Sequence, residues 1–541
     1  MAQFINAKED LVKEAIDGLL ATSGGTLSRL DGYPHIKVVY RSDWDKSRVA
    51  LISGGGSGHE PAHAGFVGKG MLTAAVCGEV FASPSVEAVL AGILAVTGEA
   101  GCLLIVKNYT GDRLNFGLAA ERARALGRKV SMVVVDDDIA LPDLPQPRGV
   151  AGTLFVHKIA GQLAEEGASL DDVTKAAETV IHKVASIGKS LDTCTVPGSP
   201  KEDRIPAGKA ELGLGIHGEP GVEQIDFAGA QDAVGIVLDR LRNTVPGGTP
   251  CVALLNNLGS TTPLEMSVLA HGLAKSGLAS HVIGPAPMMT SLDMHGFSIS
   301  LLPVTEAELS ALATPVDLAA WPGMAPLVAP TVAPLPDGLT PIAPLPSSND
   351  RTKAVIEAVA DRLIAAEPAL NALDAKSGDG DTGSTLATAA RALRARLSDM
   401  PLADLTQLFP ALGNELSQTM GGSSGVILAI YFSAAGDACA RGATVPQALR
   451  AGLDRVCDVG GARVGDRTMI DALTPALDAL ENGLAAAATA ARTGADSTAG
   501  IHRAKAGRAA YVPSDNLRGH NDPGAEAVAL VFEGLAEAAQ G

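Results

Sequence analysis

A proline-rich stretch divides this chain into two parts of different character, and this division most constrains its fold. Between Pro322 and Pro346, eight of 25 residues are prolines, with few charges and no hydrophobic periodicity. Proline at this density favours an extended, semi-stiff chain with a reach of about 3 Å per residue. We therefore expect a first domain over 1–325, a linker over 326–348 and a second domain over 349–541.

The part before the linker alternates strand-like and helix-like segments. The strand-like runs are apolar or β-branched and lie at 49–53, 102–108, 129–136, 252–255 and 281–284. The segments with helical spacing lie between them, at 85–97, 115–125, 228–241 and 264–275. This alternation predicts an α/β architecture with helices covering the sheets. A helical stretch over 150–187 indicates a break between two α/β lobes, and we place the start of the second lobe near residue 200.

After the linker the strand signals vanish. The sequence is rich in Ala, Leu and Arg with helical spacing, and Gly/Ser/Asp clusters interrupt it at 377–384, 421–425, 460–466 and 519–524. This pattern favours an all-helical bundle or barrel whose ligand site is built from interhelical loops. The predicted fold class is therefore multidomain, with two α/β lobes, a linker and an all-α domain.

Bulk properties narrow the class of protein. The formal net charge of −18 argues against nucleic acid or an anionic membrane as the main partner. The first residues show no basic segment followed by an apolar one, and we find no apolar run long enough to span a membrane. Six scattered cysteines, without a C-x-x-C pair, are typical of reduced thiols. We expect a cytoplasmic enzyme.

Three carboxylates stand close together at the start of the second domain. Asp374, Asp379 and Asp381 are interleaved with glycines, and oxygen ligands of this kind suit Mg²⁺ or Ca²⁺. A helix predicted to follow would place free backbone N–H groups beside the cations, where phosphate oxygens bind well. A calcium loop or a plain Asp/Gly turn capped by Thr382 is the alternative. An EF-hand counted from Asp379 fails, because its fifth position is Gly383 and its twelfth is alanine.

Three motifs in the first domain carry polar side chains. Residues 53–61 follow a strand-like run, and four glycines beside His59 would let a small ligand approach the backbone. Lys107 and Asp112 follow the next strand-like run and suit a polar ligand or a general base, although Asp112 could instead cap the next helix. His217 lies in a G-x-G-x-x-G pattern that lacks the strand and helix of a dinucleotide site, so it is a nucleophile, a ligand or a core residue.

These motifs, in this order, closely resemble the single-chain, ATP-dependent dihydroxyacetone kinases. The resemblance rests on 54–65, 108–116, 215–221 and 378–383, and it spans nearly the whole chain. It implies that His217 bonds covalently to the carbonyl carbon of a ketose as a hemiaminal, and that Asp112 and His59 assist the reacting hydroxyl. It also implies that the Asp374, Asp379 and Asp381 carboxylates hold two Mg²⁺ ions bridging the phosphates of ATP. The expected substrate contacts are Gly56, Ser57, Gly58, His59, Lys107, Asp112 and His217.

The expected nucleotide contacts lie on loops of the helical domain. They are Thr382, Gly383, Ser384, Thr385, Ser423, Ser424, Gly460, Thr468, Met469, Arg508, Asp522, Pro523 and Gly524, although Ser423, Ser424 and 522–524 could simply cap helices. We expect a homodimer with exchanged helical domains, binding a small ketose and ATP. Three alternatives stay open: a kinase for erythrulose or glyceraldehyde, an FMN-forming lyase activity on FAD, and a non-catalytic ligand sensor. The retained aspartates argue against the sensor.

Overall fold

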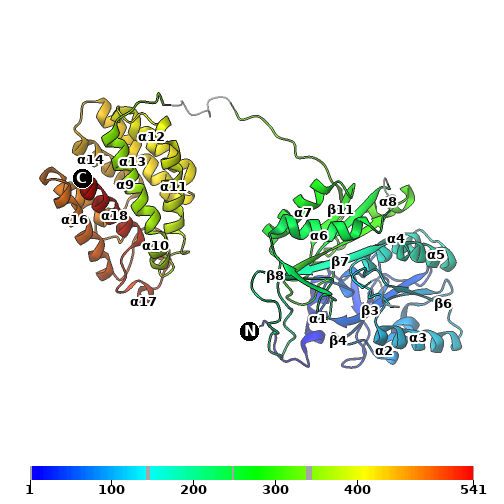
Figure 1. Ribbon diagram of the computed structural model, residues 1–541. Coiled ribbons are helices and arrows are strands. Elements are labelled where there is room, and N and C mark those ends of the chain that lie inside the picture. The colour runs from blue at the N-terminus through cyan, green and yellow to red at the C-terminus, as the bar shows by residue number, and fades with distance from the viewer. Residues whose placement is uncertain (1–2, 142–145, 246–248, 337–343, 540–541) are drawn as a thin grey trace. The chain divides into compact units, whose positions relative to one another are not determined.

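The computed structural model describes residues 3–141, 146–245, 249–336 and 344–539 (Figure 1). The chain separates into two compact units, Met1–Val332 and Ala333–Gly541. The division falls inside the proline-rich stretch. Each unit is described here by itself.

The first unit contains a six-stranded sheet in the order β1-β2-β4-β3-β5-β6. Its strands are β1 (Leu27–Arg29), β2 (Val38–Arg41), β3 (Ala50–Ser57), β4 (Ala74–Val80), β5 (Cys102–Lys107) and β6 (Val130–Val135). The four strands β4, β3, β5 and β6 are parallel, and β1 and β2 add an antiparallel edge. The helices that accompany this sheet are α1 (Leu11–Thr22), η1 (Ala64–Phe66), α2 (Val86–Val96), α3 (Thr110–Ala125), α4 (Thr153–Glu165) and α5 (Leu170–Ile181).

A second, seven-stranded sheet has the order β13-β11-β10-β12-β7-β8-β9. Its strands are β7 (Ala185–Ser190), β8 (Lys209–Leu212), β9 (Glu223–Asp226), β10 (Cys251–Asn257), β11 (His281–Ala286), β12 (Gly296–Pro303) and β13 (Met324–Pro326). Its helices are α6 (Ala230–Arg242), α7 (Pro263–Ser276) and α8 (Glu306–Ala313). Only β10 and β11 pair in parallel. Because β7 already belongs to this sheet, the expected start of the second lobe near residue 200 is too late, and the stretch 150–187 is not free of strand.

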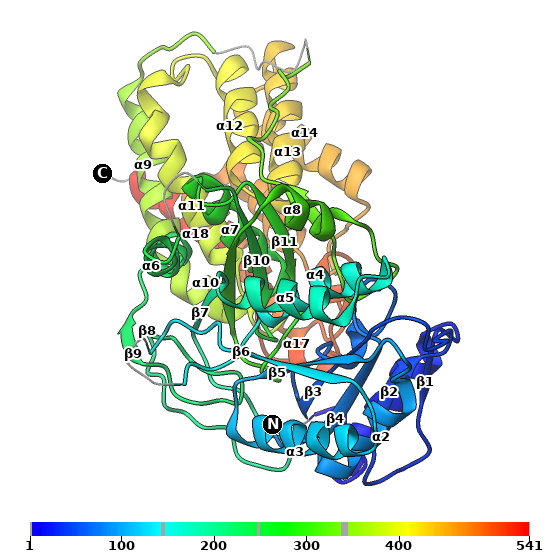
Figure 2. The same cartoon turned by 90° about the vertical axis from the view of Figure 1, so that its right-hand side faces the viewer.

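The two sheets are layered with helices between and outside them (Figure 2). In β10, Val252 and Leu254 join the core around α4 and α5, whereas Ala253 and Leu255 join the core under α6 and α7. Successive strand residues face opposite sides of a sheet, so both faces of β10 are buried and its sequence is a continuous apolar run. The same rule gives the six-stranded sheet one face toward α2 and α3 and the other toward α4 and α5.

The second unit is helical throughout its described residues, apart from one isolated bridge between Ser347 and Pro401. Its helices are α9 (Asp350–Ala365), α10 (Glu367–Asp374), α11 (Thr382–Arg396), α12 (Leu405–Thr419), α13 (Gly422–Ala440), α14 (Val445–Gly460), α15 (Ile470–Ala479), α16 (Leu484–Ser497), α17 (Ser514–Leu517) and α18 (Pro523–Ala538). Four 3₁₀ turns join them, at Leu397–Asp399, Leu480–Asn482, Thr498–Gly500 and Arg508–Tyr511. Consecutive contacts α9–α11–α12–α13–α14–α15–α16–α18–α9 close the helices into a ring. The predicted fold class, with a helical barrel after two α/β lobes, is confirmed.

Helix α13 corrects one expectation about apolar runs. It has 19 residues and, among the described residues, is the one helix long and apolar enough to cross a membrane. In the helical ring it packs between α12 and α14. Helices that pack inside soluble proteins can have the same length and apolar composition, so these two properties alone are weak evidence for a membrane span.

Candidate active site

The candidate site of the first unit forms where β3 and β5 end. In the order β4-β3-β5-β6, the chain passes from β3 to β4 on one side and then crosses to β5 on the other. Open α/β sheets bind ligands beyond the carboxyl ends of strands at such a reversal. A Cβ placed on Gly55, where φ is 147°, would lie 3.0 Å from Lys107 Nζ and 3.4 Å from Asp112 Oδ2. The two motifs therefore converge, and Gly55 leaves open the space that these side chains flank.

The neighbouring predicted substrate contacts, Gly56, Ser57 and Gly58, help to set the shape of the loop. A Cβ on Gly56 would lie 2.7 Å from the backbone nitrogen of Ala82, so this position requires a glycine. Ser57 donates its hydroxyl hydrogen to the Gly78 carbonyl at 2.8 Å. Gly58, with a φ of 101°, donates its N–H to a carboxylate oxygen of Glu60 at 2.9 Å. The loop is thus held in a fixed shape by its own hydrogen bonds.

Lys107 is fully buried at the end of β5. Its Nζ lies 2.9 Å from His63 Nε2, and His63 Nδ1 lies 3.0 Å from Nε2 of the buried His157. Burial lowers the pKa of all three groups, that of His157 to about 3. The histidines are therefore neutral at pH 7, and His63 presents a nitrogen to the Lys107 amine.

Asp112 lies in the first turn of α3 and is 2% exposed. The helix begins with Tyr109 at its N-cap, so Asp112 is not the cap that the alternative reading proposed. Its Oδ1 accepts the hydroxyl hydrogen of Ser83. A carboxylate held at the edge of this space is placed to accept a proton from a bound hydroxyl group.

His59 is buried, and its geometry fixes its tautomer. Nδ1 lies 2.9 Å from the Thr290 carbonyl oxygen, which only accepts hydrogen bonds, so Nδ1 carries the proton. Nε2 is buried without a hydrogen-bond partner among the described residues. Burial lowers the pKa of His59 well below its ordinary value, and the nearby Lys107 and His217 lower it further. His59 therefore offers a free lone pair.

His217 lies on the loop between β8 and β9 and meets three aromatic rings. Its ring centroid lies 4.8 Å from that of His59, 5.3 Å from that of Phe81 and 4.4 Å from that of Tyr109, each at a steep interplanar angle. His59 itself stacks on Phe81. The second sheet thus brings its histidine to the site built by the first, and the predicted catalytic residues His59 and His217 are neighbours.

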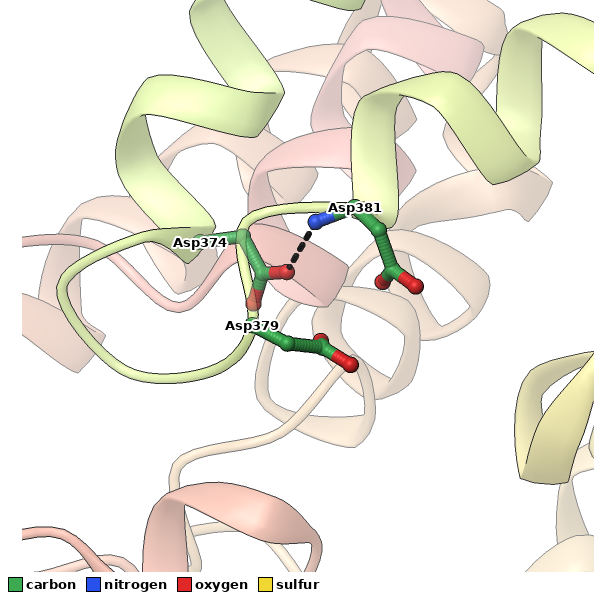
Figure 3. A group of neighbouring side chains, drawn as sticks. All are labelled: Asp374, Asp379 and Asp381. Atoms are coloured by element: carbon green, nitrogen blue, oxygen red, sulfur yellow. Dashed lines mark hydrogen bonds between the residues drawn. The ribbon is translucent and has the colours of Figure 1, made fainter. Parts of the chain in front are cut away.

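The candidate site of the helical unit is the aspartate loop between α10 and α11 (Figure 3). Asp374 is buried at the end of α10, and its Oδ2 accepts the backbone N–H groups of Gly380, Asp381 and Thr382 at 3.0–3.2 Å. Carboxylate oxygens of Asp374, Asp379 and Asp381 all lie within 4.8 Å of one another. Asp379 and Asp381 are exposed, so the loop presents two carboxylates to solvent and fixes itself with the third.

The carboxylates of this loop repel one another. The hydrogen bond from Arg508 lowers the pKa of Asp379. Desolvation and the charge of Asp379 raise the pKa of Asp381. A divalent cation fits such a loop, because its positive charge would relieve the repulsion between the crowded carboxylates. Hard cations such as Mg²⁺ also prefer oxygen ligands.

The predicted nucleotide residues next to this loop lie in the first turn of α11, and two of them pack this helix against α10. Thr382 begins α11, and the N-cap is Asp381, so the plain turn capped by Thr382 is not formed. Ser384 donates its hydroxyl hydrogen to Glu367 and accepts one from the Asn371 amide. A Cβ on Gly383 would lie 2.2 Å from the Glu367 carbonyl oxygen. Gly383 and Ser384 therefore pack α11 against α10, and Thr385 follows them within α11.

The remaining predicted nucleotide residues lie at helix ends. Ser423 and Ser424 are exposed in the first turn of α13, and Gly460 is the exposed last residue of α14. Thr468 and Met469 precede α15, Arg508 bonds Asp379 across the loop, and Asp522, Pro523 and Gly524 begin α18. Asp522 accepts the Ala525 N–H at 2.9 Å, as a helix cap does, and burial raises its pKa to about 6. The structure leaves their contact with a nucleotide as a prediction.

Several residues of the site carried no usable signal in the sequence. Phe81, Ser83 and Tyr109 reach the histidines or Asp112 only through the fold, and isolated residues of these types are common in any core. Glu219 contacts His217 and could have been noticed as a carboxylate two residues away. Arg467, buried beside Asp522, lies next to Thr468 in the motif at 465–469.

Comparison with known proteins agrees with this division. Residues 17–320 match the Dak1 domain and residues 376–537 match the DAK2 domain. The chain is 48% identical to the dihydroxyacetone kinase of Citrobacter freundii over 550 residues, covering 99% of each chain. It is 40% identical to the triokinase/FMN cyclase of Homo sapiens, again over 99% of each. The crystal structure of the Citrobacter freundii enzyme in complex with AMP-PNP and Mg²⁺ is 46% identical, with a TM-score of 0.69 over 99% of both chains.

The fold, the candidate site in each unit and these similarities define a two-domain kinase that acts on a small molecule. The chain belongs to the dihydroxyacetone kinase family, with a Dak1 part that is α/β and a DAK2 part that is helical.

Proposed function

We propose that this kinase uses ATP to phosphorylate a terminal hydroxyl of dihydroxyacetone, giving dihydroxyacetone phosphate, while His217 holds the ketose as a hemiaminal. One observation carries the proposal. A cluster of four polar side chains beside the glycine loop, His59, Lys107, Asp112 and His217, occurs in the same chain as an open loop of three aspartates. The first suits a small carbonyl compound with hydroxyl groups, and the second suits a metal–phosphate complex.

Covalent capture would solve a problem of size. A three-carbon ketose offers little surface to bind, so non-covalent contacts alone give limited affinity. In the proposed complex Lys107 and the loop at 55–58 surround the ketose, and His217 bonds its carbonyl carbon. Asp112 and the free Nε2 of His59 are the acceptors near the hydroxyl that would be phosphorylated. Loss of the hydroxyl proton to such an acceptor assists attack on the γ-phosphate.

In the helical unit, the three aspartates would hold two Mg²⁺ ions, which neutralise the charge of the triphosphate. The exposed, closely spaced oxygens of Asp379 and Asp381 fit this role, and Asp374 keeps the loop in shape. The backbone N–H groups at the start of α11 and α13 and the residues near 468, 508 and 522 complete the proposed nucleotide contacts. A sensor protein would have no need of this loop.

We propose further that the protein is a cytoplasmic homodimer in which helical domains are exchanged. The expected linker over 326–348 is shortened in the structure, because β13 ends at Pro326 and Ser347 pairs with Pro401, which leaves the 20 residues 327–346 between them. At about 3 Å per residue they could reach about 60 Å, which is long enough to cross to another subunit. All six cysteines are free thiols, as expected in a reducing compartment.

A substrate panel tests the proposed reaction. Release of ADP is measured with dihydroxyacetone, erythrulose, glyceraldehyde and glycerol, each with ATP and Mg²⁺. We expect rapid turnover of dihydroxyacetone and negligible turnover of glycerol, which has hydroxyl groups of similar placement but no carbonyl. Equal rates with dihydroxyacetone and glycerol would remove covalent capture. A higher rate with erythrulose would shift the assignment to a four-carbon ketose, and FMN release from FAD in parallel assays would reveal the lyase activity.

A further inference from the structure

The loop that carries His217 folds one of its own carboxylates back onto the histidine. The backbone N–H of His217 donates to Glu219 Oε2 at 2.8 Å, and His217 Nδ1 lies 3.4 Å from Glu219 Oε1. A Cβ on Gly215 would lie 2.2 Å from Glu219 Oε2, so only glycine at 215 admits this fold. Gly218, with a φ of 78°, supplies the turn between the two residues.

The two carboxylate oxygens of Glu219 therefore face the backbone N–H and the Nδ1 atom of His217, and each oxygen can accept a hydrogen bond there. Burial acts to raise the pKa of Glu219, but its bonds with His217 outweigh this and lower the pKa to about 2. The side chain is then a carboxylate at neutral pH, and a carboxylate accepts hydrogen bonds at both oxygens. Its position opposite Nδ1 favours the imidazole tautomer with the proton on Nδ1 and a lone pair on Nε2.

We propose that Glu219 is a positioning residue that fixes His217 in the Nδ1–H tautomer and thereby presents Nε2 as the nucleophile for the ketose carbonyl. This inference rests on the proposed covalent capture. The edge-on contacts of His217 with Phe81 and Tyr109 hold the ring plane, so the ring cannot easily turn to exchange its two nitrogens. Nucleophile, orienting carboxylate and enclosing rings thus form one unit.

The addition balances with Glu219 in this role. The Nε2–carbon bond forms, the π bond of the carbonyl breaks, and its oxygen takes a proton from solvent to become the hemiaminal hydroxyl. The imidazole ring loses its Nδ1 proton to Glu219, which returns a proton to solvent. No atom of the ketose leaves, so the adduct has the mass of the protein plus the whole ketose.

The substitution Glu219→Gln tests this role. A glutamine has one acceptor and one donor at its end. If the glutamine oxygen still accepts the His217 backbone N–H, the glutamine NH₂ group faces Nδ1. This arrangement favours the tautomer with the proton on Nε2, and a protonated Nε2 has no lone pair with which to attack the ketose. The matched control is Glu223→Gln on β9, an exposed carboxylate of the same hairpin that pairs with Arg240.

Two measurements on the full-length protein decide the matter. Native mass spectrometry with dihydroxyacetone follows adduct formation, and ¹⁵N chemical shifts of the His217 imidazole report its tautomer without substrate. We expect Glu219→Gln to slow adduct formation by about 10²–10⁴-fold, the range of general acid–base assistance, and to lower kcat/KM in parallel. Glu223→Gln should behave like the wild type in both measurements.

The outcomes separate this inference from the proposed function. Wild-type protein that binds and phosphorylates dihydroxyacetone without forming an adduct would overturn covalent capture and the inference with it. Wild-type protein that forms the adduct while His217 carries its proton on Nε2 would overturn the role of Glu219 alone, even if Glu219→Gln fails to fold. Normal adduct formation by a folded Glu219→Gln protein would do the same.

Discussion

Replacing Asp374 and replacing Asp381 by asparagine should both abolish ATP turnover, yet only the first should destabilise the metal-free protein. Asp374 is 6% exposed, and its Oδ2 accepts three backbone N–H groups, those of Gly380, Asp381 and Thr382. Hydrogen bonds to a charged acceptor contribute about 1.5–3 kcal/mol each, and neutral ones about 0.5–1.5 kcal/mol. Asparagine makes all three neutral, so we expect Asp374→Asn to cost about 3 kcal/mol.

The expected change can be measured in the full-length protein with EDTA present. For a unit of this size a loss of 1 kcal/mol lowers the melting temperature by about 2–4 °C, so the transition of the helical unit should fall by about 6–12 °C. Asp381 is exposed, and desolvation and the charge of Asp379 raise its pKa, so Asp381→Asn removes repulsion and should not lower the melting temperature. Hydrogen exchange at the amides of 380–382 should accelerate only in Asp374→Asn. Equal melting and exchange in the two variants would refute the separation of roles.

Three further predictions concern the first unit and the assembly. His217→Ala should abolish the ketose adduct seen by native mass spectrometry, whereas Asp112→Asn should keep the adduct and lower kcat by about 10²–10⁴-fold; the reverse pattern would make Asp112 a binding residue. Burial raises the pKa of Asp137 from 3.8 to about 6, so its contribution to stability is present below pH 3.8 and is lost as pH rises through about 6. Asp137→Asn should flatten this part of the pH profile of the unfolding free energy of the first unit, measured with urea, and an unchanged slope would contradict the burial argument. A verified heterodimer of His217→Ala and Asp381→Asn chains should recover activity if helical domains are exchanged, and its failure to do so would indicate catalysis within one chain.

The sequence predicted the parts of the fold that depend on local patterns. The apolar runs at 102–108 and 129–136 correspond to β5 and β6 because both faces of these strands are covered by helices. β7 was missed because its sequence, Ala-Ser-Ile-Gly-Lys-Ser, mixes small and polar residues in a fully buried strand. Its burial depends on pairing with β12, more than 100 residues later, and no local pattern shows such a pairing.

The sequence also located the main polar residues of the candidate site, because loops with several glycines beside His, Lys or Asp are unusual. It did not show which side chains enclose them. Tyr109 lies within the motif at 108–116, but nothing in that motif indicates that its ring lies nearest to His217 among the aromatic contacts of that histidine. The Lys107–His63–His157 chain joins β5, the glycine loop and α4, and its hydrogen bonds depend on how three separate segments pack.

The candidate sites of the two units use the same physical device. In each, a carboxylate within a glycine-containing loop accepts N–H groups of that loop, Asp374 from Gly380, Asp381 and Thr382, and Glu219 from His217. A loop satisfied by its own carboxylate has a fixed shape before a ligand arrives, so binding does not have to order it. In the proposed mechanism the side chains beside that carboxylate carry the chemistry: Asp379 and Asp381 would hold a metal, and Nε2 of His217 would attack a carbonyl carbon. We therefore expect the isosteric changes Asp374→Asn and Glu219→Gln to be more damaging than most substitutions in a loop, because each alters the carboxylate that fixes the shape of its loop.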